Sequence, residues 1–525
     1  MTHTWSAPSG WYNAAVDLVD RHVPAGLGEK VAFVDPSREL TYGALEDRTN
    51  RFANLLAHLG IAPEQRLVLI LRDTTDFPVA FWGAIKAGVV AVPVSTMLAP
   101  DQWHHLIEDS RAAGVVVSAE LLDQVAPVLR QVQKNRSLAV MVTGPDLEGR
   151  LADAEPRCHP ARTHADEVAF WLYTSGSTGR PKGARHLHAS LATTAECYGH
   201  HILGITSDDV VYSVAKLFFA YGLGNGMSFP LSVGATAVLL PDRPTPTAVF
   251  QLMRTWQPTI FCGVPTLLAA MLANPDLTTG AGSPRLRTTI SAGEALPQEI
   301  GQRWRARVGT DVLDGIGSTE MLHIFISNRP NDVRYGSTGK PVPGYQARVV
   351  DEAGHHVATG EIGELLVAGP TAADGYWNQR DRSRKTFAGE WTHTGDKYRV
   401  DRDGYFYYCG RTDDMFKVSG IWVAPFEVES ALVTHPSVLE AAVVGQEDVD
   451  GLIKPKTFVV LAPTHPFSPQ LFDQLKEHVK AAIGPWKYPR WIEVVAELPK
   501  TATGKIQRYR LRGGANPVGG DSAPA

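Results

Sequence analysis

Short apolar runs separated by helical stretches recur along the N-terminal half of the chain. Runs of this length with few charges are typical of buried strands. A helix is predicted over 78–87, because Pro78 falls in its first turn and Gly88 follows its end. The alternation predicts an α/β fold with parallel sheets that helices cover on both faces. The predicted strands are 67–71, 89–94, 115–117, 138–142, 168–173, 210–214, 236–240, 259–262 and 288–291.

The pattern changes from about Val333 onward. Short strand-like segments at 347–351, 363–367 and 405–409 are separated by Gly, Pro and Asp turns, which predicts a small antiparallel unit. A break falls near 411–414. The stretch beyond it predicts a small α+β domain, with strands near 441–444, 456–461 and 491–495 and a helix near 470–483.

Length and composition narrow the class of protein. A chain of 525 residues is too long for one core, so two or more domains are expected. We predict an N-terminal domain over 1–411, a C-terminal domain over 412–513 and a disordered tail over 514–525, which is rich in Gly, Pro and Ala. The net charge of −5 gives no indication of nucleic-acid binding.

The remaining bulk features favour a cytoplasmic protein. The four cysteines are widely spaced without a metal-ligand pattern, which is typical of reduced thiols in the cytosol. The N-terminus has no basic and apolar signal pattern. The longest apolar run, 77–94, contains Pro78, Lys86 and Pro93, so a core helix and strand explain it better than a membrane span. We therefore expect no membrane partner.

The first candidate for chemistry is the segment 174–183, Thr-Ser-Gly-Ser-Thr-Gly-Arg-Pro-Lys-Gly, which follows a predicted strand. Its glycines allow backbone N–H groups to face an anion, its hydroxyls add donors, and Lys182 can place a charge on a phosphate. It differs from a P-loop, because Pro181 and Gly183 flank the lysine and a helix is unlikely to start there. A Gly/Ser surface loop is the alternative.

The order of residues in this segment resembles the phosphate-binding signature of the adenylate-forming superfamily, which includes acyl-CoA synthetases, aryl-CoA ligases, peptide-synthetase adenylation domains and luciferases. Further motifs of the superfamily follow in the expected order, and together they are hard to explain by chance. They are Ser-Ala-Gly-Glu at 291–294, Asp-Gly-Ile-Gly-Ser-Thr-Glu at 314–320, Thr-Gly-Asp at 394–396, Gly-Arg-Thr-Asp-Asp at 410–414, and Pro-Lys-Thr-Ala-Thr-Gly-Lys at 499–505.

The resemblance implies a large N-terminal domain of two α/β lobes and a small β unit, followed by a small mobile C-terminal domain. It also implies ATP, Mg²⁺ and coenzyme A as cofactor and substrates. Lys505 would neutralise charge as a carboxylate attacks the α-phosphate, and Glu320 would bind Mg²⁺. The residues implied to contact ATP or AMP are Thr174, Ser175, Gly176, Ser177, Thr178, Gly179, Lys182, Ala292, Gly293, Glu294, Asp314, Gly315, Ile316, Gly317, Ser318, Thr319, Asp396 and Arg411.

Several of these roles have plain structural alternatives. Asp396 could form an Asx turn instead of accepting bonds from ribose hydroxyls, and Lys505 could be a solvated lysine in a Gly-Lys loop. Ile316 departs from the aromatic residue of many relatives, so aliphatic packing is expected to replace stacking on adenine.

The segment 216–226 is aromatic and then glycine-rich, a composition that suits a flat aromatic ligand but also ordinary core packing. Both it and 318–325 resemble the corresponding strings of benzoate-CoA ligases. By that resemblance the aryl-acid pocket would be lined by Ala220, Tyr221, Gly317, His323 and Ile324. His323 would either bond a ring substituent or only form a wall.

The resemblance further implies two half-reactions separated by a rotation of the small domain. Asp413 matches the hinge position. A tunnel for the pantetheine of coenzyme A would be formed by Lys417, Gly420 and Trp422, although the same residues could be an ordinary strand. We therefore expect an ATP- and CoA-dependent ligase for benzoate, small-molecule partners and a possible homodimer. The alternatives are an enzyme that loads an aryl acid onto a carrier protein, a ligase for hydroxy- or aminobenzoate, and a non-catalytic nucleotide sensor.

Overall fold

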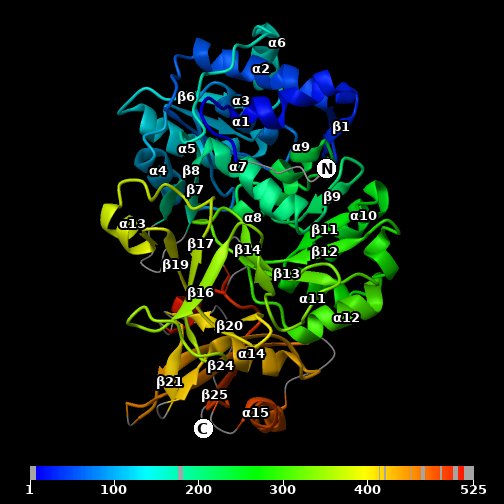
Figure 1. The fold of residues 1–525 in the computed structure, drawn as a ribbon, viewed down its shortest axis with the longest axis vertical. Helices are drawn as coiled ribbons and strands as arrows, with labels where there is room; N and C mark the ends of the chain where they lie inside the picture. The colour runs from blue at the N-terminus through cyan, green and yellow to red at the C-terminus, as the bar shows by residue number, and fades with distance from the viewer. Residues whose placement is uncertain are drawn as a thin grey trace. The chain divides into compact units, whose positions relative to one another are not determined.

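The structure is a computed structural model that describes residues 7–174, 181–412, 414–418, 421–449, 451–462, 468–484, 487–500 and 506–512 (Figure 1). The chain forms two compact units. The first comprises Met1–Ala347 and Leu366–Thr394, and the second comprises Arg348–Leu365 and Gly395–Ala525. The expected N-terminal domain over 1–411 and C-terminal domain over 412–513 remain predictions, and the expected tail at 514–525 lies outside the described residues.

A six-stranded sheet forms one half of the first unit, in the order β6-β5-β3-β4-β7-β8. Neighbouring strands are parallel except for β7 and β8, which pair antiparallel. The parallel strands confirm the interpretation of the apolar runs. The strands are β3 (Arg66–Ile70), β4 (Val90–Pro93), β5 (Gly114–Val117), β6 (Ala139–Val142), β7 (Val168–Thr174) and β8 (Lys182–Leu187).

Strand β3 shows why this sheet is buried on both faces. Leu67 and Leu69 pack into one hydrophobic cluster, whereas Val68 and Ile70 pack into another on the opposite side. Because side chains alternate across a strand, four consecutive apolar residues serve two cores at once. The covering helices are α2 (Tyr42–His58), α3 (Asp76–Lys86), α4 (Pro100–Asp109), α5 (Leu122–Gln133) and α6 (Pro145–Asp153).

A nine-stranded sheet forms the other half, in the order β15-β14-β13-β12-β11-β9-β10-β1-β2. Its central strands are parallel, and antiparallel strands close both edges. The strands are β1 (Val31–Val34), β2 (Glu39–Thr41), β9 (Val210–Ser213), β10 (Thr236–Val238), β11 (Ile260–Gly263), β12 (Thr288–Ser291), β13 (Val312–Gly317), β14 (Ile324–Ser327) and β15 (Lys340–Pro341).

Figure 1 shows helices α10, α11 and α12 beside the strands of this sheet, and their apolar side chains share a core with β9 and β11. The remaining helical segments of the first unit are shorter. The helical segments are α1 (Ala14–Leu18), η1 (Asp20–His22), η2 (Val23–Leu27), η3 (Ala119–Leu121), α7 (His188–Thr194), η4 (Ala195–His200), α8 (Ala220–Leu223), η5 (Gly224–Ser228), α9 (Phe229–Val233), α10 (Pro246–Trp256), α11 (Pro265–Ala273), η6 (Thr279–Gly282), α12 (Gln298–Val308) and α13 (Arg380–Thr386).

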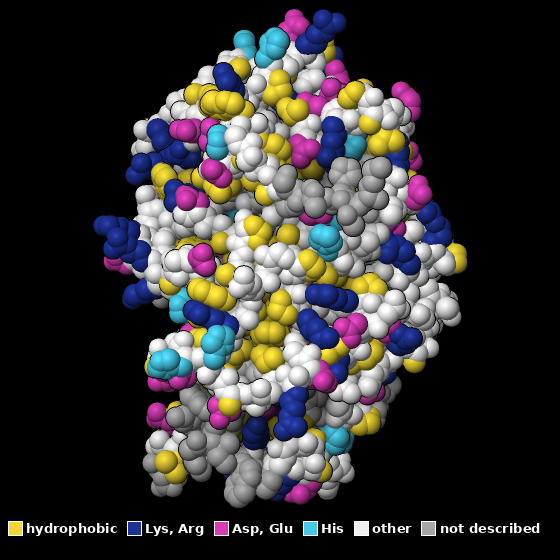
Figure 2. All heavy atoms as spheres, in the orientation of Figure 1, with side chains coloured by type: hydrophobic (Ala, Val, Ile, Leu, Met, Phe, Trp, Pro, Cys, Tyr) yellow, Lys and Arg dark blue, Asp and Glu magenta, His cyan; other side chains and the backbone are white. Residues whose placement is uncertain are grey.

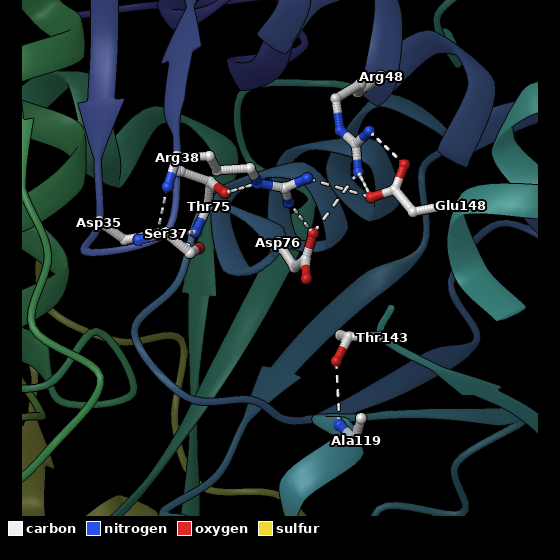
Figure 3. A network of polar contacts seen from close by, with 9 residues as sticks. All are labelled: Asp35, Ser37, Arg38, Arg48, Thr75, Asp76, Ala119, Thr143 and Glu148. Atoms are coloured by element: carbon white, nitrogen blue, oxygen red, sulfur yellow. Dashed lines mark hydrogen bonds and ion pairs between the residues drawn. The ribbon is translucent and has the colours of Figure 1, made fainter. Parts of the chain in front are cut away.

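A polar network joins elements of the two sheets (Figure 3). Arg48 of α2 binds Glu148 of α6 through two hydrogen bonds of 2.7 and 2.8 Å. Arg38, which follows β1, donates to the same carboxylate at 3.1 Å and also pairs with Asp76 of α3. Paired guanidinium and carboxylate groups of this geometry fix orientation more than they add stability. The network therefore sets the register between the two halves.

The second unit begins as antiparallel strands, as the short segments predicted. Residues 396–400 of β19 (Trp391–Val400) pair antiparallel with 406–411 of β20 (Phe406–Arg411). The strands β23, β24 and β25 then form a three-stranded sheet with α14 and α15 packed against it. The other elements of this part of the chain are β16 (Gln346–Val350), β17 (Gly363–Ala368), β18 (Phe387–Ala388), β21 (Phe416–Val418), β22 (Ile421–Val423), α14 (Pro425–Val433), β23 (Val438–Glu447), β24 (Ile453–Leu461), α15 (Pro469–Ile483), β25 (Trp491–Val494) and α16 (Arg508–Arg512).

Three further features of the structure concern its helices, its surface charge and its cysteines. Among the described residues, no helix is both long and apolar enough to cross a membrane. On the face drawn in Figure 2, basic and acidic side chains are interspersed among neutral ones. The four cysteines are free.

Candidate functional site

The segment expected to bind phosphate connects two strands of the six-stranded sheet. Thr174 ends β7 and Lys182 begins β8, and the two residues are partners in the antiparallel ladder. The expectation that no helix starts at Lys182 is therefore confirmed. Ser175, Gly176, Ser177, Thr178 and Gly179 lie outside the described residues.

Lys182 and Glu320, which are far apart in the sequence, are brought together with Tyr376. The Lys182 ammonium lies 3.5 Å from Glu320 Oε1 and donates to the Tyr376 hydroxyl at 3.1 Å. The same hydroxyl donates to Glu320 Oε1 at 2.6 Å. The Lys182 ammonium also lies 4.4 Å from the centre of the Tyr376 ring. The three side chains combine a cation, an anion and a fixed dipole in one place.

The turn that carries Glu320 is strained at one residue. Leu322 has a φ of 68°, a backbone conformation that bulky residues rarely adopt, while its side chain is buried in the core. The Ser318 hydroxyl accepts the N–H of Met321 at 3.2 Å, which closes the turn. Burial of Leu322 offsets the strain, and the turn presents Glu320 on one side and His323 on the other.

The motifs expected to enclose adenine follow adjacent parallel strands. Ala292, Gly293 and Glu294 come directly after β12, and Gly293 has a φ of 91°. On β13, Asp314, Gly315, Ile316 and Gly317 lie in sequence, and Ile316 faces Ile326 across the β13–β14 pair. Because carboxyl ends of parallel strands meet at one sheet edge, both motifs lie at the same edge.

Asp314 is a buried acid within this edge. Burial raises the pKa of its carboxyl well above the usual range, and backbone N–H groups of Gly315 and Leu296 oppose that shift only in part. Among the described residues, Asp314 Oδ1 has no hydrogen-bond partner. A neutral carboxyl can both donate and accept, which suits the edge of a purine ring.

An aromatic cluster surrounds His323, one of the residues predicted to line the aryl pocket. The His323 ring lies 5.8 Å from Tyr221, 5.1 Å from Tyr198 and 4.6 Å from Phe229, measured between ring centres. The Tyr221 hydroxyl donates to the carbonyl of Gly263 at 3.1 Å, so the hydroxyl is engaged outside the cluster. Apolar surroundings of this kind suit a flat ring.

His323 is electrically neutral in this cluster. Burial lowers the pKa of its imidazole to about 3, and the backbone of Tyr221 opposes the shift only in part. Neither ring nitrogen meets a partner at hydrogen-bond geometry among the described residues. Of the other predicted pocket residues, Ile324 is buried, Ala220 is half-buried and Gly317 is exposed.

Asp396 and Arg411 come together in the second unit. They are partners in the β19–β20 ladder, and the Arg411 guanidinium donates to Asp396 Oδ1 at 3.0 Å. Gly395 has a φ of 71°, and a Cβ there would lie 2.9 Å from the guanidinium. Local sheet geometry thus brings together two residues that were each predicted to contact ATP or AMP.

The other predicted residues are described only in part. Lys417 and Trp422 are backbone partners in the β21–β22 hairpin. Asp413, Gly420 and Lys505 lie outside the described residues.

Three residues of the site were missed by reasoning from the sequence. Tyr376 contacts Lys182, 194 residues earlier in the chain, and Glu320, 56 residues earlier. Tyr198 and Phe229 enclose His323. The adjacent aromatic pair in Gly-Tyr-Trp at 375–377 was the available signal for Tyr376. No local pattern distinguishes Tyr198 or Phe229 from ordinary core residues.

Comparison with known proteins agrees with this geometry. A 4-hydroxybenzoate–CoA/benzoate–CoA ligase from Rhodopseudomonas palustris is 54% identical over 95% of this chain and 94% of the relative. A benzoate–CoA ligase from Thauera aromatica is also 54% identical, over 95% of this chain and 96% of the relative. The crystal structure of a benzoate CoA ligase from Burkholderia xenovorans LB400 matches with a TM-score of 0.90 and 49% identity, covering 95% of this chain and all of that one.

Family models give the same result at the level of domains. The model described as AMP-binding enzyme matches residues 20–377, and the model described as AMP-binding enzyme C-terminal domain matches residues 427–505. The chain belongs to the family of AMP-binding enzymes, as the order of its motifs predicted.

Proposed function

We propose that this chain joins benzoate, or a close benzoate derivative, to coenzyme A at the expense of ATP. The carboxylate attacks the α-phosphate, which gives benzoyl-AMP and releases pyrophosphate. The thiol of coenzyme A then attacks the acyl carbon, loses its proton and displaces AMP. Identity of 54% to two ligases named for benzoate, over nearly the whole chain, supports this substrate.

The observation that carries the chemistry is the cluster of Lys182, Tyr376 and Glu320. Joining a carboxylate to a polyphosphate brings two anions together, so neutralisation and positioning dominate the barrier. Lys182 supplies a positive charge beside the end of β7, where the Ser/Thr/Gly segment begins. In our proposal that segment and Lys182 hold the β- and γ-phosphates and then pyrophosphate.

Glu320 could supply one ligand to a magnesium ion whose other ligands come mainly from the nucleotide phosphates. Among the described residues no group of three or more His, Cys, Asp or Glu could hold a metal ion. A Mg²⁺ bound by Glu320 would therefore take its other ligands from phosphate and water oxygens, the donors that this ion prefers. When bound, the ion would offset phosphate charge.

Asp314 and the pair of Asp396 and Arg411 account for the nucleoside in this proposal. The buried carboxyl of Asp314, whose pKa burial raises, can meet the adenine edge, beside the glycines of 293 and 315. The carboxylate of Asp396 offers two acceptor oxygens to ribose hydroxyls, and Arg411 orients it.

Three residues outside the described part of the chain, Lys505, Asp413 and Gly420, complete the proposal. Lys505 neutralises charge during adenylation, and Asp413 is the hinge about which the small domain rotates. Lys417, Gly420 and Trp422 then form the tunnel for pantetheine. The order of the superfamily motifs in the sequence supports these three assignments.

The His323 cluster favours benzoate over benzoates with polar substituents. The neutral ring of His323 lies among Tyr221, Tyr198 and Phe229, which are apolar surfaces. A ring hydroxyl or amino group could still pair with a bare imidazole nitrogen, so hydroxy- and aminobenzoates are the second choice. One methyl-sized change in such a pocket alters discrimination by only about 1–3 kcal/mol.

A carrier-protein acceptor is the alternative to free coenzyme A. The named relatives at 54% identity are CoA ligases, which favours coenzyme A. A cytoplasmic location and a homodimer remain predictions from the sequence.

The test is release of AMP with ATP, Mg²⁺ and benzoate, with and without free coenzyme A. Fast turnover only with coenzyme A, greatest on benzoate within a panel of substituted benzoates and aliphatic acids, is expected. Adenylate formation without transfer to coenzyme A would indicate a carrier protein, and activity only on aliphatic acids would refute the aryl pocket.

Lys505→Ala tests the first half-reaction. We expect this variant to lose nearly all formation of benzoyl-AMP, measured in a single turnover. If it forms benzoyl-AMP at the wild-type rate, the role of Lys505 is wrong.

A further inference from the structure

Residues 371–377 connect the strand of Lys182 to the turn of Glu320. The N–H of Ala373 donates to the Glu320 carbonyl at 2.8 Å. At the other end of the segment, the N–H of Trp377 donates to the Gly183 carbonyl at 2.8 Å. Backbone hydrogen bonds thus fix this segment against both functional residues.

Tyr376 lies within this segment, and its side chain is 4% exposed. Its hydroxyl accepts from the Lys182 ammonium and donates to the Glu320 carboxylate. Each hydrogen bond polarises the next in such a chain, so the direction of donation is defined. The hydroxyl therefore bridges the ammonium and the carboxylate, accepting at 3.1 Å and donating at 2.6 Å.

The hydroxyl also keeps the two charges apart. A direct ammonium–carboxylate bond is about 2.8 Å long, whereas Lys182 and Glu320 are 3.5 Å apart. If they closed into a direct pair, each charge would satisfy the other. Phosphate would then have to break an ion pair between two partly buried side chains.

We infer that Tyr376 is a positioning residue, which spaces Lys182 and Glu320 so that the ammonium stays available to phosphate. The inference rests on the proposed role of Lys182 in phosphate binding. Tyr376 touches neither acid nor nucleotide in this role, and it acts through the two charged side chains.

Tyr376→Phe removes the hydroxyl and leaves the ring. We expect the KM for ATP to rise about tenfold, the kcat to fall less than threefold, and the KM for benzoate to stay within twofold. Pyrophosphate binding measured by calorimetry without metal should weaken by a similar factor. A crystal structure of the variant should show the Lys182–Glu320 distance shortened to a direct contact.

Tyr345→Phe is the matched control. Its hydroxyl is also buried and bonds Thr371 of the same segment at 2.7 Å, but it contacts neither Lys182 nor Glu320. Loss of a buried hydroxyl is therefore common to both variants. We expect Tyr345→Phe to leave the KM for ATP and pyrophosphate binding within twofold of the wild type.

Lys182→Ala separates failure of this inference from failure of the proposed function. If Lys182→Ala binds pyrophosphate as the wild type does, the phosphate role of Lys182 is wrong. If Lys182→Ala weakens binding but Tyr376→Phe does not, the inference about Tyr376 alone is overturned. Adding Tyr376→Phe to Lys182→Ala should change binding less than twofold, and a further tenfold loss would also overturn the inference.

Discussion

Two buried carboxylates of the first unit meet opposite electrostatic surroundings. Burial raises the pKa of Asp73 to about 6, and Lys216 and the N–H of Leu217 offset only part of the cost. Burial acts on Asp209 as well, but hydrogen bonds from Arg287 and Thr259 outweigh it and lower its pKa. An ionised aspartate therefore destabilises the fold at position 73 and stabilises it at position 209.

The first prediction concerns Asp73→Asn. Since the folded pKa of Asp73 exceeds the unfolded value of 3.8, its folded state binds more protons, and stability falls as pH rises from 3.8 to about 6. The asparagine avoids this loss and can still accept from Leu217. We expect the variant to be more stable at pH 7 by up to about 3 kcal/mol, with no difference below pH 4. Urea unfolding of the first unit at pH 4, 5.5 and 7 measures this.

Asp209→Asn is the control of opposite sign. Its lowered folded pKa means that the carboxylate stabilises the fold above the unfolded pKa, and that this contribution is lost as pH falls through the folded value. The variant should therefore be less stable than the wild type at pH 7 and approach it in acid. If both substitutions shift stability in the same direction at pH 7, the electrostatic account is wrong.

At the scale of elements, the position of His323 in the proposed aryl pocket depends on one glycine of a helical turn. The chain passes from α8 into the π-helical segment η5 at Gly224. A Cβ on Gly224 would lie 2.5 Å from His323 Cδ2 and 2.9 Å from Phe229 Cζ. Contacts that short do not occur between real atoms, so the His323 ring can occupy its place only because residue 224 is glycine.

The second prediction follows for Gly224→Ala. The added methyl group must displace the His323 ring, which Tyr198 and Phe229 confine, and overpacking of this kind costs about 1–3 kcal/mol. We expect the KM for benzoate to rise about tenfold or more, while the KM for ATP stays within twofold. Steady-state kinetics with each substrate varied in turn measure both values.

Gly226→Ala provides the comparison on the same element. A Cβ there would lie 3.1 Å from a methyl group of Leu217 and 3.6 Å from Ser213, and the leucine can move by a few tenths of an ångström. Its KM for benzoate should change less than threefold. An unchanged KM for benzoate in Gly224→Ala would mean that His323 does not form the pocket wall.

The sequence predicted some strands of the two sheets and missed others. Strands β3 to β7 were predicted because each is a short apolar run, and burial on both faces produces such runs. Strand β8 was missed, since Lys-Gly-Ala-Arg-His-Leu at 182–187 has no apolar run and pairs only because β7 lies beside it. The edge strands β2 and β15 were missed because they are short and not apolar runs. Strand β14, Ile-Phe-Ile-Ser at 324–327, was missed although it is a buried apolar run.

At the scale of the whole molecule, sequence reasoning found the residues that lie in motifs and missed a residue that depends on a long-range contact. Motif order in the sequence singled out Lys182, Glu320, Asp396 and Arg411. The structure places Lys182 3.5 Å from Glu320 and joins Arg411 to Asp396 by a hydrogen bond, and neither contact was predicted. Tyr376 was not identified, because its role follows from a contact between distant segments that no spacing rule encodes. Sequence motifs can indicate the chemistry of a site, but the distance between charged groups such as Lys182 and Glu320 is set only by the folded chain.

The second unit contains an ion-pair network that bears on the two half-reactions. Arg508 of α16 binds Glu429 of α14 through its two Nη2 contacts of 2.8 Å, and lies 3.5 Å from Asp414. Asp414 also pairs with Arg512 at 2.6 Å. Asp414 directly follows the proposed hinge, and α16 begins three residues after Lys505. The network therefore connects the chain after the proposed hinge to the chain after Lys505, the proposed catalytic lysine.

The third prediction is that Asp414→Asn slows adenylation and spares thioester formation. Without its charge α16 is held less firmly, so Lys505 is less well placed, and Glu429 still binds Arg508 and keeps the unit folded. We expect the rate of benzoyl-AMP formation to fall about five- to tenfold. The reaction of purified benzoyl-AMP with coenzyme A should stay within twofold, because in the proposed mechanism Lys505 takes part only in the first step. Single-turnover experiments on each half-reaction measure the two rates.

Glu477→Gln tests whether loss of any ion pair in this unit has the same effect. Glu477 pairs with Lys480 at 2.6 Å on the exposed face of α15, and such pairs contribute only about 0.2–1 kcal/mol. Both half-reactions should stay at the wild-type rate in this variant. An equal loss of both half-reactions in Asp414→Asn would mean that Asp414 supports the fold or the rotation as a whole, and that its charge does not serve Lys505. A loss confined to adenylation is expected if the mobile domain uses a different face for each step. In that case the residues around Lys505 affect adenylation and leave thioester formation unchanged.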